Sequence, residues 1–153
     1  ILYRACPTGS LTDTDNSSDA NSVNKTPFSD VESGAFYTKA MNWAYANGIL
    51  TGVDGKGEMQ PNREITREEL ACVMMRYAKS CGIAGVDAEP SEEGITDWAD
   101  VSSFATSSIK WALANGVISG VDNLDGTRSL CPHDSASRAQ MAKIILNVEA
   151  MRG

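Results

Sequence analysis

The 153-residue chain has few of the residue types from which active sites and metal centres are usually built. It contains one histidine, His133, and four cysteines without any Cys-x-x-Cys pair, so the spacing of a zinc or redox motif is missing. A nucleophile elbow and a phosphate-binding glycine loop are missing as well. We therefore expect no enzyme activity, no metal site, no cofactor, and no catalytic or metal role for His133.

Long apolar runs and clusters of basic residues are also lacking. No apolar run approaches the roughly 20 residues that a membrane-spanning helix needs, which predicts no membrane insertion. The 13 Lys and Arg residues are scattered and outnumbered by 20 Asp and Glu residues, for a formal net charge of −7. Because nucleic-acid-binding proteins neutralise phosphates with clustered cations, we expect no nucleic-acid partner.

Two of the cysteines fall on one predicted helix. Cys72 and Cys81 would lie about 13.5 Å apart along its axis, too far for a disulfide while the helix persists. Cys72 fits the pattern of a small buried apolar residue. The oxidation state of Cys6 and Cys131 stays open.

One segment of the chain occurs twice. Residues 36–53, FYTKAMNWAYANGILTGV, return at 104–121 as FATSSIKWALANGVISGV, with nine of the eighteen positions identical. After a variable loop, a second matching block begins at Pro61 and again at Pro132, so the spacing between copies grows from 68 to 71 residues. Repeated units of this kind usually bury their apolar faces by stacking on one another.

The repeat sets the expected organisation of the chain. We expect repeat one at 28–82, a polar linker at 83–94 and repeat two at 95–153. Residues 1–27 are interpreted as the end of an upstream region followed by a polar linker, because they hold too little apolar surface to offset chain entropy. Each repeat predicts two helices from apolar residues at helical spacing, with a glycine ending the first helix. The predicted fold class is all-α: tandem helix-loop-helix repeats packed as a pseudo-symmetric helical bundle, with short extended segments only.

The order of elements in each repeat resembles that of an S-layer homology (SLH) repeat. That family opens with Phe-x-Asp, continues with a helix carrying a Trp-Ala pair, then an Asn-Gly and a glycine-rich turn. A proline follows, and Thr-Arg-Ala-Glu starts the second helix. The matching residues are Phe28 to Asp30 and Ile95 to Asp97, Trp43-Ala44 and Trp111-Ala112, Asn47-Gly48 and Asn115-Gly116, Gly52 and Gly120, and Thr66 to Glu69 and Ser137 to Gln140.

The resemblance implies a non-catalytic module at the bacterial cell surface. Such modules hold exported proteins on secondary cell-wall polysaccharide, often a polymer with acidic pyruvyl groups, through non-covalent binding. The family usually has three repeats around a pseudo-threefold axis with ligand grooves between neighbours, whereas this chain has two. A third repeat elsewhere, or another chain, would complete that arrangement. The alternative is a protein–protein assembly module whose repeats pack on other SLH repeats or chains without binding glycan.

Two roles are open for the residues at the start of each second helix. Thr66 with Glu69, and Ser137 with Gln140, fit a capping box, which is a structural role. The intervening arginines are not needed for capping, and a cation is mildly unfavourable at a helix N-terminus. Each arginine is therefore expected to have a partner, either an internal carboxylate or an anionic ligand that suits its planar guanidinium. Free amides at these helix N-termini would also face an anion. The candidate ligand-binding residues are Arg67, Arg138, Asp30, Asp97, Thr66, Ser137, Glu69 and Gln140.

The aromatic residues of the repeats favour core positions over sugar-stacking ones. Trp43 and Trp111 are flanked by alanine on a predicted buried stripe. Phe36 and Phe104 stand at helical spacing on the same helices, which is more typical of core packing than of a stacking platform.

Overall fold

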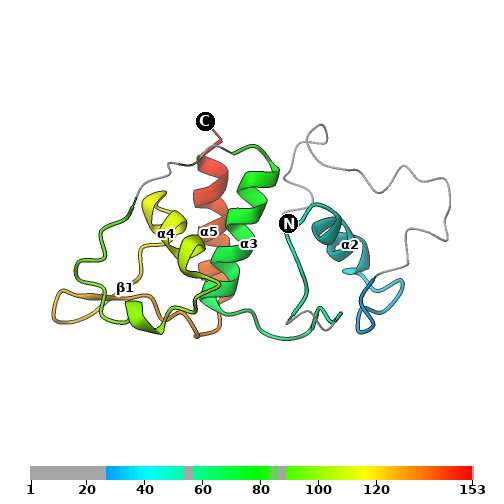
Figure 1. Cartoon of the computed structure of the whole chain (residues 1–153), viewed down its shortest axis with the longest axis horizontal. Helices are drawn as coiled ribbons and strands as arrows, with labels where there is room; N and C mark the ends of the chain where they lie inside the picture. Colours follow the sequence, from blue (N-terminus) through cyan, green and yellow to red (C-terminus); the bar gives the residue numbers. More distant parts are fainter. Residues whose placement is uncertain (1–26, 54–56, 84, 86–88, 153) are drawn as a thin grey trace. The chain divides into compact units, whose positions relative to one another are not determined.

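The computed structural model describes residues 27–53, 57–83, 85 and 89–152 (Figure 1). The linker predicted at 1–27 thus lies almost entirely outside the described residues. The described elements are α2 (Thr38–Ala46), α3 (Arg67–Ser80), the short 3-10 helix η2 (Trp98–Asp100), α4 (Thr106–Ala114), β1 (Val121–Asp122), β2 (Arg128–Ser129) and α5 (Arg138–Ala150). Each predicted repeat therefore supplies two α-helices, α2 with α3 and α4 with α5.

The molecule is mostly helical, but the all-α prediction needs a correction. Strands β1 and β2 form a small antiparallel sheet, with Val121 opposite Ser129 and Asp122 opposite Arg128. The turn between them is closed by a hydrogen bond from the Asn123 amide to the Thr127 carbonyl (2.8 Å). Among its described residues, repeat one forms an isolated bridge, Val53 to Glu58, at the corresponding place. The longer loop of repeat two has enough residues for two pairs of opposite residues in an antiparallel ladder.

The described residues separate into two compact units. The N-terminal unit comprises 27–63 together with Ser80–Gly82, and the C-terminal unit comprises Glu64–Lys79 and the described residues from Ile83 onward. The division falls between the two helices of repeat one, so that α3 shares a unit with α4 and α5. The repeat boundaries themselves stay a prediction from the sequence.

The N-terminal unit packs around the residues that open repeat one. Phe28, Val31 and Met59 are buried together, and Tyr37, Met41 and Leu50 pack against them. The Phe28 ring meets the Tyr45 ring edge to face, with centroids 4.9 Å apart. Helix α2 buries Trp43 and Ala44, as its apolar pattern predicts.

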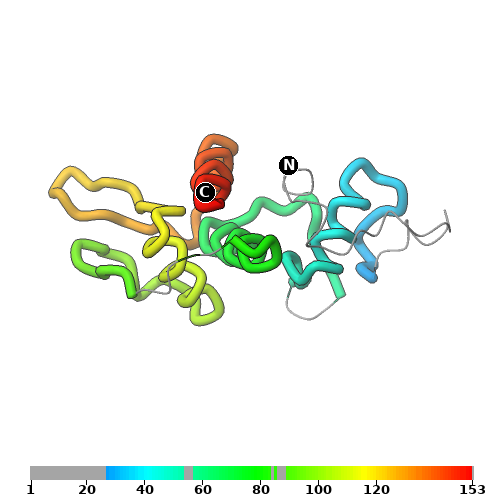
Figure 2. The backbone as a smooth tube through the Cα atoms, turned by 90° about the horizontal axis from the view of Figure 1, so that it is seen from above, coloured from blue at the N-terminus to red at the C-terminus, as the bar shows by residue number. Residues whose placement is uncertain are grey.

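The C-terminal unit is built around three helices. Helices α3 and α5 lie side by side with their N-termini at the same end (Figures 1 and 2). The amphipathic face predicted for α3 is confirmed, since Leu70, Met74 and Tyr77 are buried. Helix α4 buries Ile109 and Ala112, and α5 buries Ile144 and Val148. Ala142 of α5 is exposed.

The cysteines behave partly as the spacing predicts. Cys72 is buried and free, and Cys131 is also free. Cys81 is disulfide-bonded. Cys72 and Cys81 are therefore not paired with each other. In the part of the chain that the structure describes, no helix is long and apolar enough to cross a membrane.

Candidate ligand-binding site at the start of helices α3 and α5

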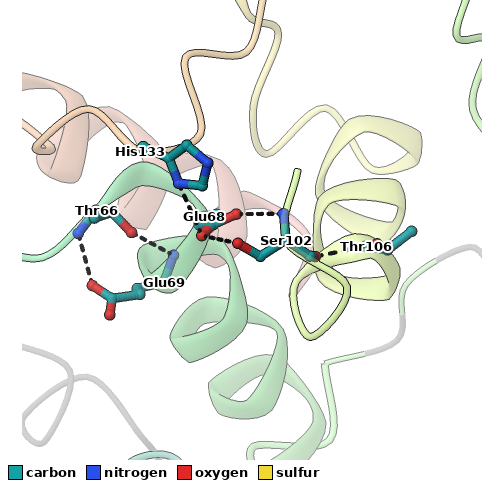
Figure 3. Close-up of polar contacts among 6 residues, drawn as sticks. All are labelled: Thr66, Glu68, Glu69, Ser102, Thr106 and His133. Carbon is teal, nitrogen blue, oxygen red and sulfur yellow. Dashed lines mark hydrogen bonds and ion pairs between the residues drawn. The ribbon is translucent and has the colours of Figure 1, made fainter. Parts of the chain in front are cut away.

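Both second helices begin with the predicted capping box. At α3 the Thr66 hydroxyl accepts from the Glu69 amide (3.3 Å), and the Glu69 carboxylate accepts from the Thr66 amide (2.9 Å) (Figure 3). At α5 the Ser137 hydroxyl accepts from the Gln140 amide (3.2 Å), and the Gln140 side chain accepts from the Ser137 amide (2.8 Å). These reciprocal bonds satisfy backbone donors that a helix start leaves unpaired, so all four residues have a structural role.

The start of α3 is joined to the segment that precedes α5. Thr66 and Ser135 form an antiparallel bridge. The Arg67 amide donates to the Asp134 carbonyl (2.9 Å), and the Glu68 amide donates to the Pro132 carbonyl (3.1 Å). The two signature segments, one from each repeat, therefore lie next to each other in the C-terminal unit. These two amides are occupied by the protein, which corrects the expectation that the start of α3 offers free amides to an anion.

The two arginines differ in their surroundings. Arg67 is half-buried, and its Nε donates to the Leu130 carbonyl (2.7 Å). Its internal partner is thus a backbone carbonyl, whereas the sequence left open either an internal carboxylate or an anionic ligand. Arg138 is exposed and makes no side-chain hydrogen bond or ion pair within the described residues, an ion pair with Asp97 included.

The two aspartates hold equivalent loops in their own repeats. The Asp30 carboxylate accepts from the amides of Met59 (2.9 Å) and Gln60 (2.6 Å). The Met59 amide is the main reason that the pKa of Asp30 lies below its usual value. The Asp97 carboxylate accepts from the amides of Leu130 and Cys131, both at 2.7 Å. Asp97 thereby anchors the backbone segment that contains the Leu130 carbonyl, which in turn accepts from Arg67.

The anchored loops share an unusual backbone conformation. Gln60 and Cys131 have φ values of 49° and 50°, in the left-handed region that residues other than glycine seldom occupy. Each is the second residue whose amide donates to the repeat's aspartate. The carboxylate thus holds a strained turn in both repeats, and the two turns are matched in sequence and in conformation.

A buried carboxylate that was not predicted from the sequence lies beside the site. The Glu68 side chain, from a residue only 3% exposed, accepts from the Ser102 amide (3.0 Å) and from the Ser102 hydroxyl (2.8 Å) (Figure 3). The Nδ1 atom of His133 lies 3.4 Å from the Glu68 carboxylate, a pair that is ionic only when His133 is protonated. The available signal was a glutamate where the SLH signature carries alanine. His133, in repeat two, thus meets a carboxylate from repeat one.

The aromatic residues divide between core and surface. Trp43 is buried as predicted, whereas Trp111 is only partly buried. The prediction that Phe36 and Phe104 belong to the core is wrong, since they are 98% and 62% exposed. Both residues precede the first turn of α2 or α4, so their side chains project before the packed face of the helix begins. Within the described residues, no group of three or more His, Cys, Asp or Glu side chains is placed to hold a metal ion.

The chain is a tandem-repeat protein. Its two helix-loop-helix repeats have matching capping boxes, matching turns held by an aspartate, and an arginine at the same position. The family model of the S-layer homology domain matches residues 27–71 and 94–142, more than half of the chain. The chain therefore belongs to the S-layer homology domain family.

Known relatives share this region of the chain. It is 34% identical over 123 residues to Exoglucanase XynX of Acetivibrio thermocellus, covering 77% of this chain and 10% of that protein. It is 35% identical over 124 residues to Amylopullulanase of Thermoanaerobacterium thermosulfurigenes, covering 77% and 6%. It is 32% identical over 130 residues to the Surface-layer 125 kDa protein of Lysinibacillus sphaericus, covering 80% and 10%. The chain thus spans a tenth or less of the length of these three relatives.

Family membership fixes the general class of function. S-layer homology domains are non-catalytic modules that anchor proteins at the cell wall, and the location of this chain is accordingly the bacterial cell surface. The enzyme names belong to relatives of which the shared region is a small part.

Proposed function

We propose that this chain anchors its parent protein by binding an anionic, pyruvylated secondary cell-wall polysaccharide without covalent attachment. Arg138 is the observation that carries the proposal. Its guanidinium is exposed at the start of α5 and has no partner within the described residues. A planar guanidinium binds a carboxylate through two parallel hydrogen bonds, which matches the pyruvyl carboxylate.

The other signature residues would support this contact from defined positions. Arg67 uses one N–H group on the Leu130 carbonyl and keeps its remaining N–H groups for a ligand. Asp30 and Asp97 would shape the binding surface by holding their turns. The capping residues Thr66, Glu69, Ser137 and Gln140 would fix the helix starts from which the arginines project.

Net charge makes these local cations necessary. A chain with a formal charge of −7 repels a polyanion at long range. Specific arginine contacts would therefore have to supply the attraction. The exposed rings of Phe36 and Phe104 add apolar faces suited to stacking on sugar rings.

The finer architecture belongs to the same proposal. We infer that the two repeats pack with pseudo-symmetry, and that a third repeat elsewhere or another chain completes the set of binding surfaces. Matching turns at Asp30 and Asp97, and matching capping boxes at α3 and α5, support this symmetry.

A second candidate function is protein–protein assembly without glycan. Large apolar side chains that face solvent favour it, in particular Leu146 on α5, which is 62% exposed. Helix α5 could in that case pack on other SLH repeats or chains. A glycan anchor and an assembly module predict different responses to removal of the wall polymer.

Co-sedimentation with purified cell walls tests the proposal. Intact walls would be compared with walls stripped of secondary polymer, using the wild type, Arg67→Ala, Arg138→Ala and the control Lys143→Ala. Lys143 is exposed on the same helix as Arg138, so this control removes one positive charge away from the site. Loss of a charged hydrogen bond corresponds to about tenfold weaker binding or more, expected for both arginine variants and not for Lys143→Ala.

The folding of each variant would be checked by circular dichroism, because Arg67 also bonds the Leu130 carbonyl. Binding that disappears on stripping and weakens in Arg138→Ala supports the anchor. Equal binding of folded wild type and Arg138→Ala to intact walls contradicts the assigned contact. Self-association without any wall binding favours the assembly module.

A further inference from the structure

Glu68 joins two repeats through a buried, charge-assisted contact. It comes from the first turn of α3, in repeat one, and its carboxylate accepts both the amide and the hydroxyl of Ser102, in repeat two. Ser102 lies just before α4, and its carbonyl in turn accepts from the Thr106 hydroxyl (3.3 Å) inside that helix. Figure 3 shows the carboxylate lying between the start of α3 and the start of α4. The contact therefore links two helices from different repeats.

Burial makes this contact sensitive to its partner. The residue is 3% exposed, and a buried carboxylate is costly unless donors replace its lost hydration. Ser102 supplies two such donors. The imidazole of His133 lies 3.4 Å away but is itself mostly exposed. A neighbour without the Ser102 hydroxyl would leave the buried carboxylate with one hydrogen-bond donor fewer.

The matching positions of the other repeat do not carry this pair. By the 71-residue spacing, Ala139 stands where repeat one has Glu68, and Ala139 is exposed. By the 68-residue spacing, Gly34 stands where repeat two has Ser102 and has no side chain to donate. The acceptor thus occurs only on the second helix of repeat one, and the hydroxyl donor only at the opening of repeat two.

We infer that Glu68 is a specificity-determining residue that selects repeat two as the neighbour of α3. Packing is favourable when the neighbour presents a serine amide and hydroxyl to the carboxylate. It is less favourable when the neighbour presents glycine or alanine, because one hydrogen-bond donor is then missing. Specificity of this kind works through the cost imposed on the wrong partner. It gives two otherwise similar repeats a fixed order of packing, and it is independent of whether the chain binds glycan.

A double-mutant cycle in the whole chain tests this inference. The variants are Glu68→Ala, Ser102→Ala and the double variant, with Ser103→Ala as the matched control, because Ser103 is the exposed neighbour of Ser102. Chemical denaturation gives the folding equilibrium constant of each. Ser102→Ala is expected to lower that constant about tenfold when Glu68 is present, and less than about twofold when residue 68 is alanine. Ser103→Ala should lower it less than about twofold in both backgrounds.

Equal costs of Ser102→Ala in the two backgrounds would overturn the inference, because Ser102 would then act independently of the carboxylate. Hydrogen exchange provides a second measurement in Glu68→Met, a variant that keeps the approximate length of the side chain and removes both acceptor oxygens. The Ser102 amide should exchange at least about tenfold faster in this variant, while the Ala105 amide, which donates to the Ser102 carbonyl, keeps its protection. Unchanged exchange at Ser102 would also contradict the inference.

Discussion

Tyr77 shows at the residue scale how one polar atom is satisfied inside the C-terminal unit. The side chain is fully buried. Its hydroxyl donates to the Glu149 carboxylate (2.8 Å) and accepts from Arg152 (2.9 Å). Burial, with the Glu149 carboxylate as a further cause, raises the pKa of Tyr77 to about 12 from 10.0. The phenol therefore stays neutral in the folded protein at pH values where an unfolded chain would lose the proton.

This shift predicts how stability depends on pH at the alkaline end. The contribution of Tyr77 is complete below pH 10 and is lost as the pH rises from 10 through about 12, because the unfolded state ionises first. In an absorbance titration of the tyrosines, we expect a late-ionising component that Tyr77→Phe removes. The same variant should lower the free energy of unfolding by about 1–2 kcal/mol through its lost hydrogen bonds.

Tyr45→Phe is the control, since Tyr45 is exposed. It should leave the late component in place. A titration of Tyr77→Phe that superimposes on that of the wild type would show that another tyrosine ionises late.

At the scale of the element, the β1–β2 hairpin depends on a glycine at its entry. Gly120 has a φ of +79°, and a Cβ atom placed on it would lie 3.1 Å from the Ser129 carbonyl oxygen. Gly52, at the matching place in repeat one, has a φ of +81° and similarly close neighbours. The backbone approaches too closely at both positions for a larger residue, which gives the repeated Gly-Val of the sequence a steric reason.

We predict that Gly120→Ala destabilises the protein more than Gly126→Ala does. Gly126 also has a positive φ, +84°, but a Cβ atom there would meet nothing within 4 Å. Gly126→Ala should cost about 1 kcal/mol from backbone strain alone, and Gly120→Ala about 1–3 kcal/mol more from the close contact. Denaturant unfolding would measure both values. Equal costs would mean that the hairpin shifts to accept the methyl group.

At the scale of the whole molecule, the two units differ in the number and length of their described helices. The C-terminal unit contains three of the four α-helices of the described residues, including the two longest, whereas the N-terminal unit contains the nine-residue α2. Helix α2 buries three residues, Thr38, Trp43 and Ala44, whereas α3 buries seven. The disulfide-bonded Cys81 falls within this unit.

We therefore expect amide hydrogens of α2 to exchange faster than those of α3. Local opening needs less free energy where fewer apolar contacts must break. Hydrogen exchange followed by mass spectrometry, on the oxidised chain at neutral pH, would resolve the two helices. The α5 helix serves as an internal reference within the C-terminal unit. Protection of α2 equal to that of α3 would contradict this expectation and indicate one cooperative fold.

The sequence by itself determined the features that depend on neighbours along the chain. The repeated blocks predicted two helices per repeat, and the capping boxes at Thr66 and Ser137 formed as expected because their partners lie three residues away. The buried face of α3 followed from its helical spacing. Membership in the family also followed from local motifs, because their order along the chain defines it.

Only the tertiary structure decided which distant groups meet. The amides that Asp97 holds lie 33 and 34 residues away, and the carbonyl that Arg67 binds lies 63 residues away. The burial of Glu68 against Ser102 depends on the same long-range packing. Spacing shows that a residue lies on a helix but not which other segment covers it, and this is why the exposure of Phe36 and Phe104 was predicted wrongly. Which residues of one repeat contact residues of the other is determined by three-dimensional packing, and the local periodicity of a sequence carries no information about it.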